Sequence, residues 1–177
     1  EQRIGFDFLT LEPEFVGKLP RIQLLACGTS WHAAQVGKFL IEELTRIPVE
    51  VDYASEYRYR DPIVDRSVLV LGVTQSGETI DTVWAMEAAK ERGARLVALS
   101  NVPGSQATRL ASGVLYTHAG PEIGVASTKA FTSQLVALYV LALALGQMRG
   151  RLRRPAVAQH LADLVRLPAL LTRTLRL

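Results

Sequence analysis

Short apolar runs alternate with longer segments of helical periodicity along most of the chain. Each apolar run has the length of a strand and is bounded by polar or turn-forming residues. The sequence SVLVLGV at 67–73 is continuously apolar and rich in valine, which is typical of a strand buried on both faces. The predicted strands are residues 21–27, 49–54, 67–73, 94–100 and 112–118.

The segments between these runs have helical spacing. Residues 30–46 carry a face of small and apolar side chains made of Ala33, Gly37, Leu40, Ile41 and Leu44. Residues 78–93 end at Gly93, and their predicted buried stripe consists of Ile80, Val83, Trp84 and Ala88. Residues 127–148 are apolar nearly all round in their second half, so we expect a heavily buried helix. The tail from Pro155 is also helical and should be broken or kinked at Pro168.

Strands that alternate with helices through short connections indicate a parallel sheet covered on both faces. We therefore predict a five-stranded doubly wound sandwich with three α/β/α layers. Residues 1–20 are interpreted as a lead-in segment, 21–150 as the domain and 151–177 as a helical linker. In such sheets ligands bind beyond the carboxyl ends of the strands, where the strand order reverses.

Composition and charge narrow the class of protein. The 177 residues are 49% hydrophobic and 21% charged, which is a globular composition, and 20 Lys and Arg barely exceed 17 Asp and Glu. The arginines at positions 149, 151, 153 and 154 lack interleaved aromatic residues, so a solvated link between helices is favoured over a nucleic-acid patch. The chain has one cysteine, no signal-peptide pattern, and an apolar run from Leu135 that is too short for a bilayer. We expect a soluble, cytoplasmic protein.

Three connections at predicted strand ends place Ser or Thr near the start of a helix, at 27–33, 74–82 and 119–132. Backbone N–H groups at a helix start have no partner within the helix and, with the helix dipole, favour an anion. In the second connection Ser76 and Thr79 add hydroxyl donors and Gln75 adds an amide, without any Lys or Arg. This ring of neutral donors suits a phosphate that must be released again.

Helix capping is the alternative for each connection taken alone. Ser76 and Thr79 have the spacing of a capping box, with Thr in place of the usual Glu. Glu78 and Asp81 are interpreted as first-turn acids that favour the helix dipole. Three such connections at one sheet edge, together with Gln75, for which capping offers no role, favour a ligand site.

Other chemistry finds less support. Cys27 could be a nucleophile at a helix start, but its nearby partner would be His32 on the following helix, and a small buried residue is the favoured interpretation. The three histidines and single cysteine lack metal-ligand spacing, so no zinc site is expected. Lys129 is the one cation in these connections. It lies at the N-terminal part of a predicted helix, where the helix dipole disfavours a positive charge, and it could contact a sugar, a phosphate or a carboxylate.

The strings ACGTSWHA, TQSGETIDT, NVPGS and EIGVASTKAFTSQ together resemble the glutamine–fructose-6-phosphate aminotransferases, also called glucosamine-6-phosphate synthases. The match is to the first of two sugar isomerase (SIS) modules and runs from about Arg21 to Met148. The S-G-x-T element is shared by many SIS domains, whereas CGTS and GVASTKAFT are specific to the synthases. The resemblance implies a five-stranded parallel SIS fold, a fructose 6-phosphate or glucosamine 6-phosphate ligand, and no metal or other cofactor.

The resemblance also assigns residues to this ligand. Thr74, Gln75, Ser76 and Thr79 would hold the phosphate, with Thr74 where the family usually has Ser. The remaining implied residues line the sugar: Cys27, Gly28, Thr29, Ser30, Val125 and Ser127.

The family's glutaminase domain and second SIS module have no counterpart here, and the latter brings the proton-transferring Glu. The chain is therefore expected to be an inactive, substrate-binding part of a larger enzyme, which is expected to be a homodimer, with residues 151–177 leading toward the second module. Two alternatives stay open. One is a regulatory SIS module that senses a phosphosugar without catalysis, and the other is an oligomer scaffold in which the connections are only caps.

Overall fold

The computed structural model describes residues 11–176, so most of the segment expected as a lead-in lies outside the described residues. The described part contains one parallel sheet of five strands in the order β2-β1-β3-β4-β5. This confirms the predicted fold class. The strands are β1 (Ile22–Ala26), β2 (Val49–Tyr53), β3 (Leu69–Val73), β4 (Arg95–Ser100) and β5 (Gly113–Tyr116).

The long helices follow the predicted segments, and several short ones were not predicted. The elements between and after the strands are α1 (Pro13–Lys18), α2 (Gly28–Thr45), α3 (Ala54–Tyr57), the 3-10 turn η1 (Arg58–Arg60), α4 (Ile80–Glu91), α5 (Gln106–Leu110), α6 (Lys129–Met148) and α7 (Arg154–Thr174). The unpredicted elements α1, α3, η1 and α5 have at most six residues, too few for an apolar period to be recognised.

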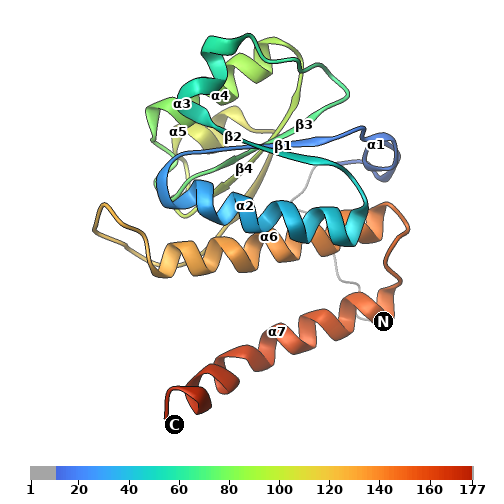
Figure 1. Cartoon of the computed structure of the whole chain (residues 1–177), viewed down its shortest axis with the longest axis vertical. Helices are drawn as coiled ribbons and strands as arrows, with labels where there is room; N and C mark the ends of the chain where they lie inside the picture. Colours follow the sequence, from blue (N-terminus) through green and yellow to red (C-terminus); the bar gives the residue numbers. More distant parts are fainter. Residues whose placement is uncertain (1–10, 177) are drawn as a thin grey trace.

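The helices form two layers around the sheet. In Figure 1, α2 and α6 lie side by side under one face, and α3, α4 and α5 cover the other. Each layer has its own core. Leu24, Leu71 and Leu138 belong to the core under α2 and α6, whereas Val70 and Met86 belong to the core under α4. Burial on both faces explains why strand β3 has no polar side chain.

Of the predicted α2 face, Ala33, Gly37 and Ile41 are buried, and Leu40 and Leu44 are partly buried against the core. The predicted stripe of α4 fits less well. Ile80 and Trp84 of the predicted α4 stripe are 47% and 40% exposed. The buried residues of α4 are instead Thr82, Val83, Ala85, Met86 and Ala89. Small side chains bring α4 close to the sheet, where a Cβ atom on Gly72 would lie only 2.2 Å from Met86 Sδ. Ile80 and Trp84 therefore lie on the outer side of α4, and the Arg58 guanidinium lies 4.4 Å from the Trp84 ring centroid.

Helix α6 is longer than its apolar run. By length and composition it is the one helix in residues 11–176 that is long and apolar enough to cross a membrane. Its buried residues, such as Leu138 and Leu145, belong to the core shared with α2 and the sheet, as in the interior helix of a folded domain. Its burial is therefore explained by the sandwich.

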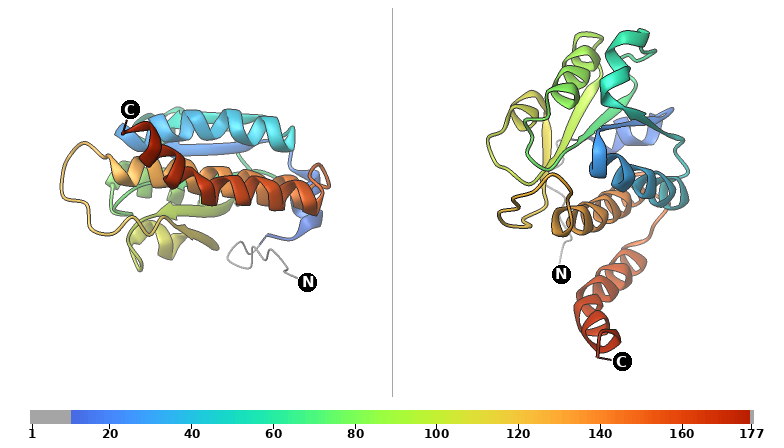
Figure 2. Two further views of the ribbon diagram at one scale, coloured as in Figure 1. Left: turned by 90° about the horizontal axis from the view of Figure 1, so that it is seen from below. Right: turned by 60° about the vertical axis from the view of Figure 1, so that its left-hand side comes forward.

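Helix α7 leaves the sandwich at one end (Figures 1 and 2). It was expected to be broken or kinked at Pro168, and it continues through this residue without a break. Near its start, Tyr139 Oη on α6 and His160 Nδ1 are hydrogen-bonded at 2.7 Å. Arg151 and Arg153 in the link before α7, and Arg154 at its first position, are exposed as expected. Arg149 differs, because its guanidinium donates to the carbonyl oxygens of residues 16 and 17.

Candidate functional site

The strand order reverses between β1 and β3, which are neighbours in the sheet although β2 separates them in the chain. Ala26 pairs with Val73 in the register of these two strands. The connections that follow, at 27–33 and 74–82, therefore start side by side at the carboxyl edge of the sheet. This is the position at which open α/β sheets bind their ligands.

The first connection leads directly into α2. Cys27 is the N-cap residue in extended conformation, and its side chain makes no capping hydrogen bond. Gly28 follows with φ +56°, a left-handed conformation that favours glycine. The first-turn N–H groups of α2 are thus not closed off by a side-chain cap. Ser30 is buried here, and its Oγ accepts a hydrogen bond of 2.9 Å from Gln134 Nε2.

The second connection is a compact turn before α4. Thr74 is buried, and its Oγ1 accepts a hydrogen bond from the Gly77 N–H at 3.2 Å and lies 3.4 Å from Thr79 Oγ1. Ser76 Oγ accepts from the Glu78 N–H at 3.1 Å. The N-cap of α4 is Thr79, and no side chain caps it. The capping-box alternative, with Ser76 and Thr79 as its members, is therefore not formed, and the helix start has no side-chain cap.

Glu78 has a different role from the one predicted. It precedes the first residue of α4, and its carboxylate accepts hydrogen bonds from the Gln106 N–H at 2.9 Å and from Gln106 Nε2 at 2.7 Å. These bonds, the backbone one first, lower the pKa of Glu78. Glu78 thus fastens the second connection to the start of α5. Asp81, by contrast, lies in the first turn of α4 as expected.

Asn101, which follows β4, links the second connection to the third. Its N–H donates to the Gln75 carbonyl oxygen at 3.0 Å, and its Nδ2 donates to the Gly120 carbonyl oxygen at 2.8 Å. Its Oδ1 accepts from Thr117 Oγ1 and from the Ala119 N–H. No role was predicted for Asn101 from the sequence. A polar side chain directly after a buried strand, at the edge where the other connections end, is the signal that could have found it.

In the third connection, the start of α6 is occupied by a carboxylate. Glu122 accepts from Ser127 Oγ at 2.8 Å and from the Thr128 N–H at 3.1 Å, and the Ser127 bond is the largest cause of its lowered pKa. Ser127 Oγ also accepts from the Phe131 N–H at 3.0 Å. The Val125 side chain is fully exposed on a loop that projects beyond the sandwich (Figure 2). Lys129 is exposed as well.

The structure thus brings the first two groups of predicted site residues to adjacent strand ends. It ties the third connection to them through Asn101 but engages the Ser127 hydroxyl internally and leaves Val125 in solvent. Cys27 is partly buried, and His32 is exposed with its ring against Trp31. Within residues 11–176 no group of His, Cys, Asp and Glu has the arrangement of a metal site.

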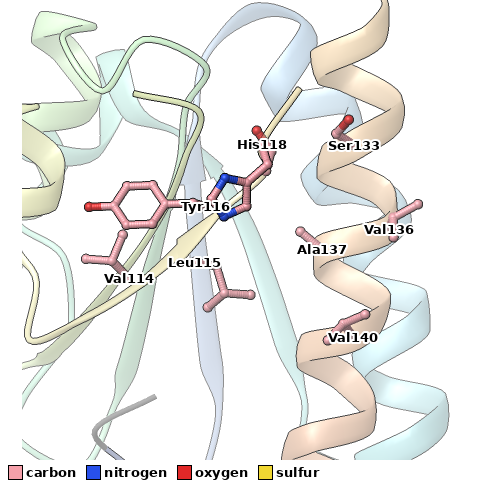
Figure 3. Close-up of a pocket in the computed structure, with 9 residues that line it drawn as sticks. Val114, Leu115, Tyr116, His118, Ser133, Val136, Ala137 and Val140 are labelled. Carbon is pink, nitrogen blue, oxygen red and sulfur yellow. The ribbon is translucent and has the colours of Figure 1, made fainter. Parts of the chain in front are cut away.

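An apolar groove lies elsewhere, between the edge strand β5 and α6. Its volume is about 360 Å³, and Figure 3 shows Val114, Tyr116 and Val140 along it, with His118 and Ser133 toward one end. It lies beside the outermost strand and not at the reversal between β1 and β3. The groove is therefore separate from the predicted site.

The five-stranded parallel sheet in this order, with the uncapped starts of α2 and α4 at the reversal point, is an open α/β domain. The chain belongs to the SIS domain family, whose profile matches residues 17–144. Among curated proteins it is 48% identical over 168 residues to the glutamine–fructose-6-phosphate aminotransferase [isomerizing] of Caldanaerobacter subterraneus, covering 95% of this chain. It is 52% identical over 148 residues to the protein of the same name from Chlorobaculum tepidum, covering 84% of this chain.

The solved structures agree with this likeness. The C-terminal domain of glucosamine-fructose-6-phosphate aminotransferase from Francisella tularensis superposes with a TM-score of 0.87 at 38% identity, covering 93% of this chain and 47% of that one. The chain spans only 28% and 24% of the length of the two curated relatives. What these relatives share with it is therefore their SIS portion.

Proposed function

We propose that this chain is the sugar-phosphate-binding SIS part of a glutamine–fructose-6-phosphate aminotransferase. The single observation that carries the proposal is the pair of helix starts, those of α2 and α4, that lack side-chain caps at the adjacent ends of β1 and β3. Open N–H groups and two parallel helix dipoles attract an anion without a cationic side chain. The names of the similar proteins supply the sugar class, fructose 6-phosphate or glucosamine 6-phosphate.

The phosphate end of the ligand fits the second connection. Ser76 and Gln75 are half-buried, so their hydroxyl and amide donors can reach a ligand while the backbone is held by Asn101 and Thr74. Thr79 and the first-turn N–H groups of α4 add further donors. No residue from 74 to 79 is cationic, which favours reversible binding of a monophosphate.

The sugar end would lie against the first connection. Gly28 brings backbone close to a ligand, and Thr29 and Ser30 add hydroxyl groups beside Cys27. From the third connection, the exposed Val125 remains available for contact, whereas Ser127 acts first as a partner of Glu122.

Catalysis would need groups from outside the chain. We propose that residues 21–150 form the binding domain, that 151–177 lead toward a second SIS module, and that a glutaminase domain and a homodimeric, cytoplasmic parent enzyme complete the system. The expected reaction is amination of fructose 6-phosphate followed by proton transfer. The chain alone is expected to bind the sugar phosphate weakly and to form no product from fructose 6-phosphate and ammonia.

Isothermal titration calorimetry tests this function directly. The chain is expected to bind glucosamine 6-phosphate and to show no binding of glucosamine at the same concentration, because the phosphate supplies the anion for the helix starts. Equal affinity for the two sugars would overturn the proposal. Product formation by the purified chain would show that catalytic groups were missed.

A further inference from the structure

Gln134 interrupts the most buried stripe of α6. Its neighbours one turn away, Ala130 and Leu138, are fully buried apolar residues of the core, and Gln134 itself is 0% exposed. A buried amide is unfavourable unless its polar atoms are hydrogen-bonded. At a fully buried position between apolar neighbours, an apolar side chain of the same size would be more favourable for folding.

The hydrogen bonding of Gln134 is incomplete. Its Nε2 donates to Ser30 Oγ at 2.9 Å, but its Oε1 is buried without a hydrogen-bond partner among residues 11–176. An unsatisfied buried acceptor is destabilising. Fold stability therefore does not account for glutamine here, and the one bond that it does make leads to a residue of the proposed site.

That bond determines what the Ser30 hydroxyl can do. A serine hydroxyl has one proton to donate and an oxygen that accepts. The oxygen accepts from Gln134, and the structure gives the proton no acceptor among the described residues. Ser30 lies in the first turn of α2, where the strand order reverses and the helix start is open. Its free proton is therefore available to an acceptor atom of a ligand bound at the proposed site.

We infer that Gln134 is a positioning residue that orients Ser30 as a hydrogen-bond donor to an oxygen atom of the bound sugar phosphate. The inference rests on the proposed function. Gln134 acts across the interface between α6 and α2. Its Nε2 donates to Ser30 Oγ, so the Ser30 hydroxyl proton can be donated to the ligand. An apolar residue at position 134 would leave Ser30 free to rotate and to donate to a backbone carbonyl oxygen instead.

The test is a double-mutant cycle with glucosamine 6-phosphate in calorimetry, using the full chain. Gln134→Met keeps the volume of the side chain and removes the amide. It is expected to weaken binding about three- to tenfold, the size of one hydrogen bond, without lowering the melting temperature. Ser30→Ala should weaken binding at least as much. In the Ser30→Ala background, Gln134→Met should produce no further loss, because the residue through which it acts is gone.

Two further variants sharpen the result. Gln134→Glu replaces the amide donor by a carboxyl group whose pKa is raised by burial. At a pH above that pKa the carboxylate accepts the Ser30 proton, and binding should be weaker than in Gln134→Met; at lower pH the protonated carboxyl can donate to Ser30, and part of the loss should be recovered. Gln147→Met is the matched control, since Gln147 is on the same helix, also has a buried Oε1 without a partner, and lies far along α6 from Ser30. Its binding is expected to equal that of the parent chain.

The failures are distinguishable. If the parent chain does not bind glucosamine 6-phosphate, the proposed function is wrong, and the inference fails with it. If the parent chain binds but Gln134→Met binds equally well, or if its effect adds fully to that of Ser30→Ala, only the positioning role is overturned.

Discussion

Gly77 and Ser105 are packed so closely that a Cβ atom on Gly77 would lie 1.9 Å from Ser105 Oγ and 2.4 Å from Ser105 Cβ. Gly77 also has φ +70°, and its carbonyl oxygen accepts from the Ala107 N–H at 3.0 Å. The turn before α4 therefore has its backbone pressed against the start of α5. No larger residue fits at this point of the proposed phosphate site.

Gly77→Ala should destabilise the protein by about 2–5 kcal/mol, because left-handed strain and overpacking act together. Gly104→Ala is the matched control, since Gly104 has φ +72° and nothing within 4 Å of an added Cβ. It should cost only the strain, about 1–2 kcal/mol. Urea unfolding measures both. Equal losses would show that the contact with Ser105 is not restrictive.

Glu78→Gln should reduce the change in the free energy of unfolding between neutral and acidic pH. Hydrogen bonds from Gln106 lower the pKa of Glu78 from 4.5, so the carboxylate stabilises the fold above that pH and loses this effect as pH falls through the lowered value. The parent chain should therefore be more stable than the variant at neutral pH, and the difference should shrink below pH 4.5. Urea midpoints across this range measure it. A difference independent of pH would contradict the assigned role.

Ser76→Ala should weaken binding of glucosamine 6-phosphate by roughly tenfold or more, because a hydrogen bond to a charged group is lost. Folding should be little affected, since Ser76 Oγ makes only one internal bond, to the Glu78 N–H. Ser133→Ala, in the groove beside β5, is the control and should bind like the parent chain. Calorimetry compares the three, and unchanged affinity in Ser76→Ala would remove Ser76 from the site.

Tyr139→Phe should loosen α7 without disturbing the sandwich. The Tyr139 hydroxyl bonds His160, and Val157 is the one α7 residue fully buried among those described. Amide exchange in residues 154–174 should accelerate, while exchange in the strands should not change. Exchange is followed by mass spectrometry after pepsin digestion. Protection of α7 equal to that in the parent chain would show that apolar packing alone holds it.

Burial patterns predicted the sheet well and the helix α4 poorly. The strands were recognisable because both faces of a central parallel strand are apolar. In α4 the largest apolar side chains, Ile80 and Trp84, suggested the wrong face. The buried side is instead formed by small residues such as Ala85 and Ala89 together with Met86, which packs against the open backbone at Gly72. Helical periodicity in the sequence does not show how large a side chain the neighbouring element leaves room for.

The candidate site shows the same division. Its location, at the ends of β1 and β3, follows from the alternation of strands and helices and from the small polar residues after each strand. The hydrogen-bond partners of the site residues could not be predicted from the sequence pattern. Glu78 has the position of a first-turn acid in the sequence, yet its carboxylate bonds Gln106 of another helix. Ser76 has capping-box spacing, but α4 begins later than that spacing requires.

The sequence by itself determined the layered parallel fold and the sheet edge at which the proposed site lies, because hydrophobic period and local turn chemistry act over a few neighbouring residues. Only the tertiary structure decided which groups meet at that edge. Gln134 and Ser30 are 104 positions apart, and Asn101 reaches Gly120 from another strand end. Such contacts depend on strand order and on how the α2 and α6 layer packs, which no local pattern specifies.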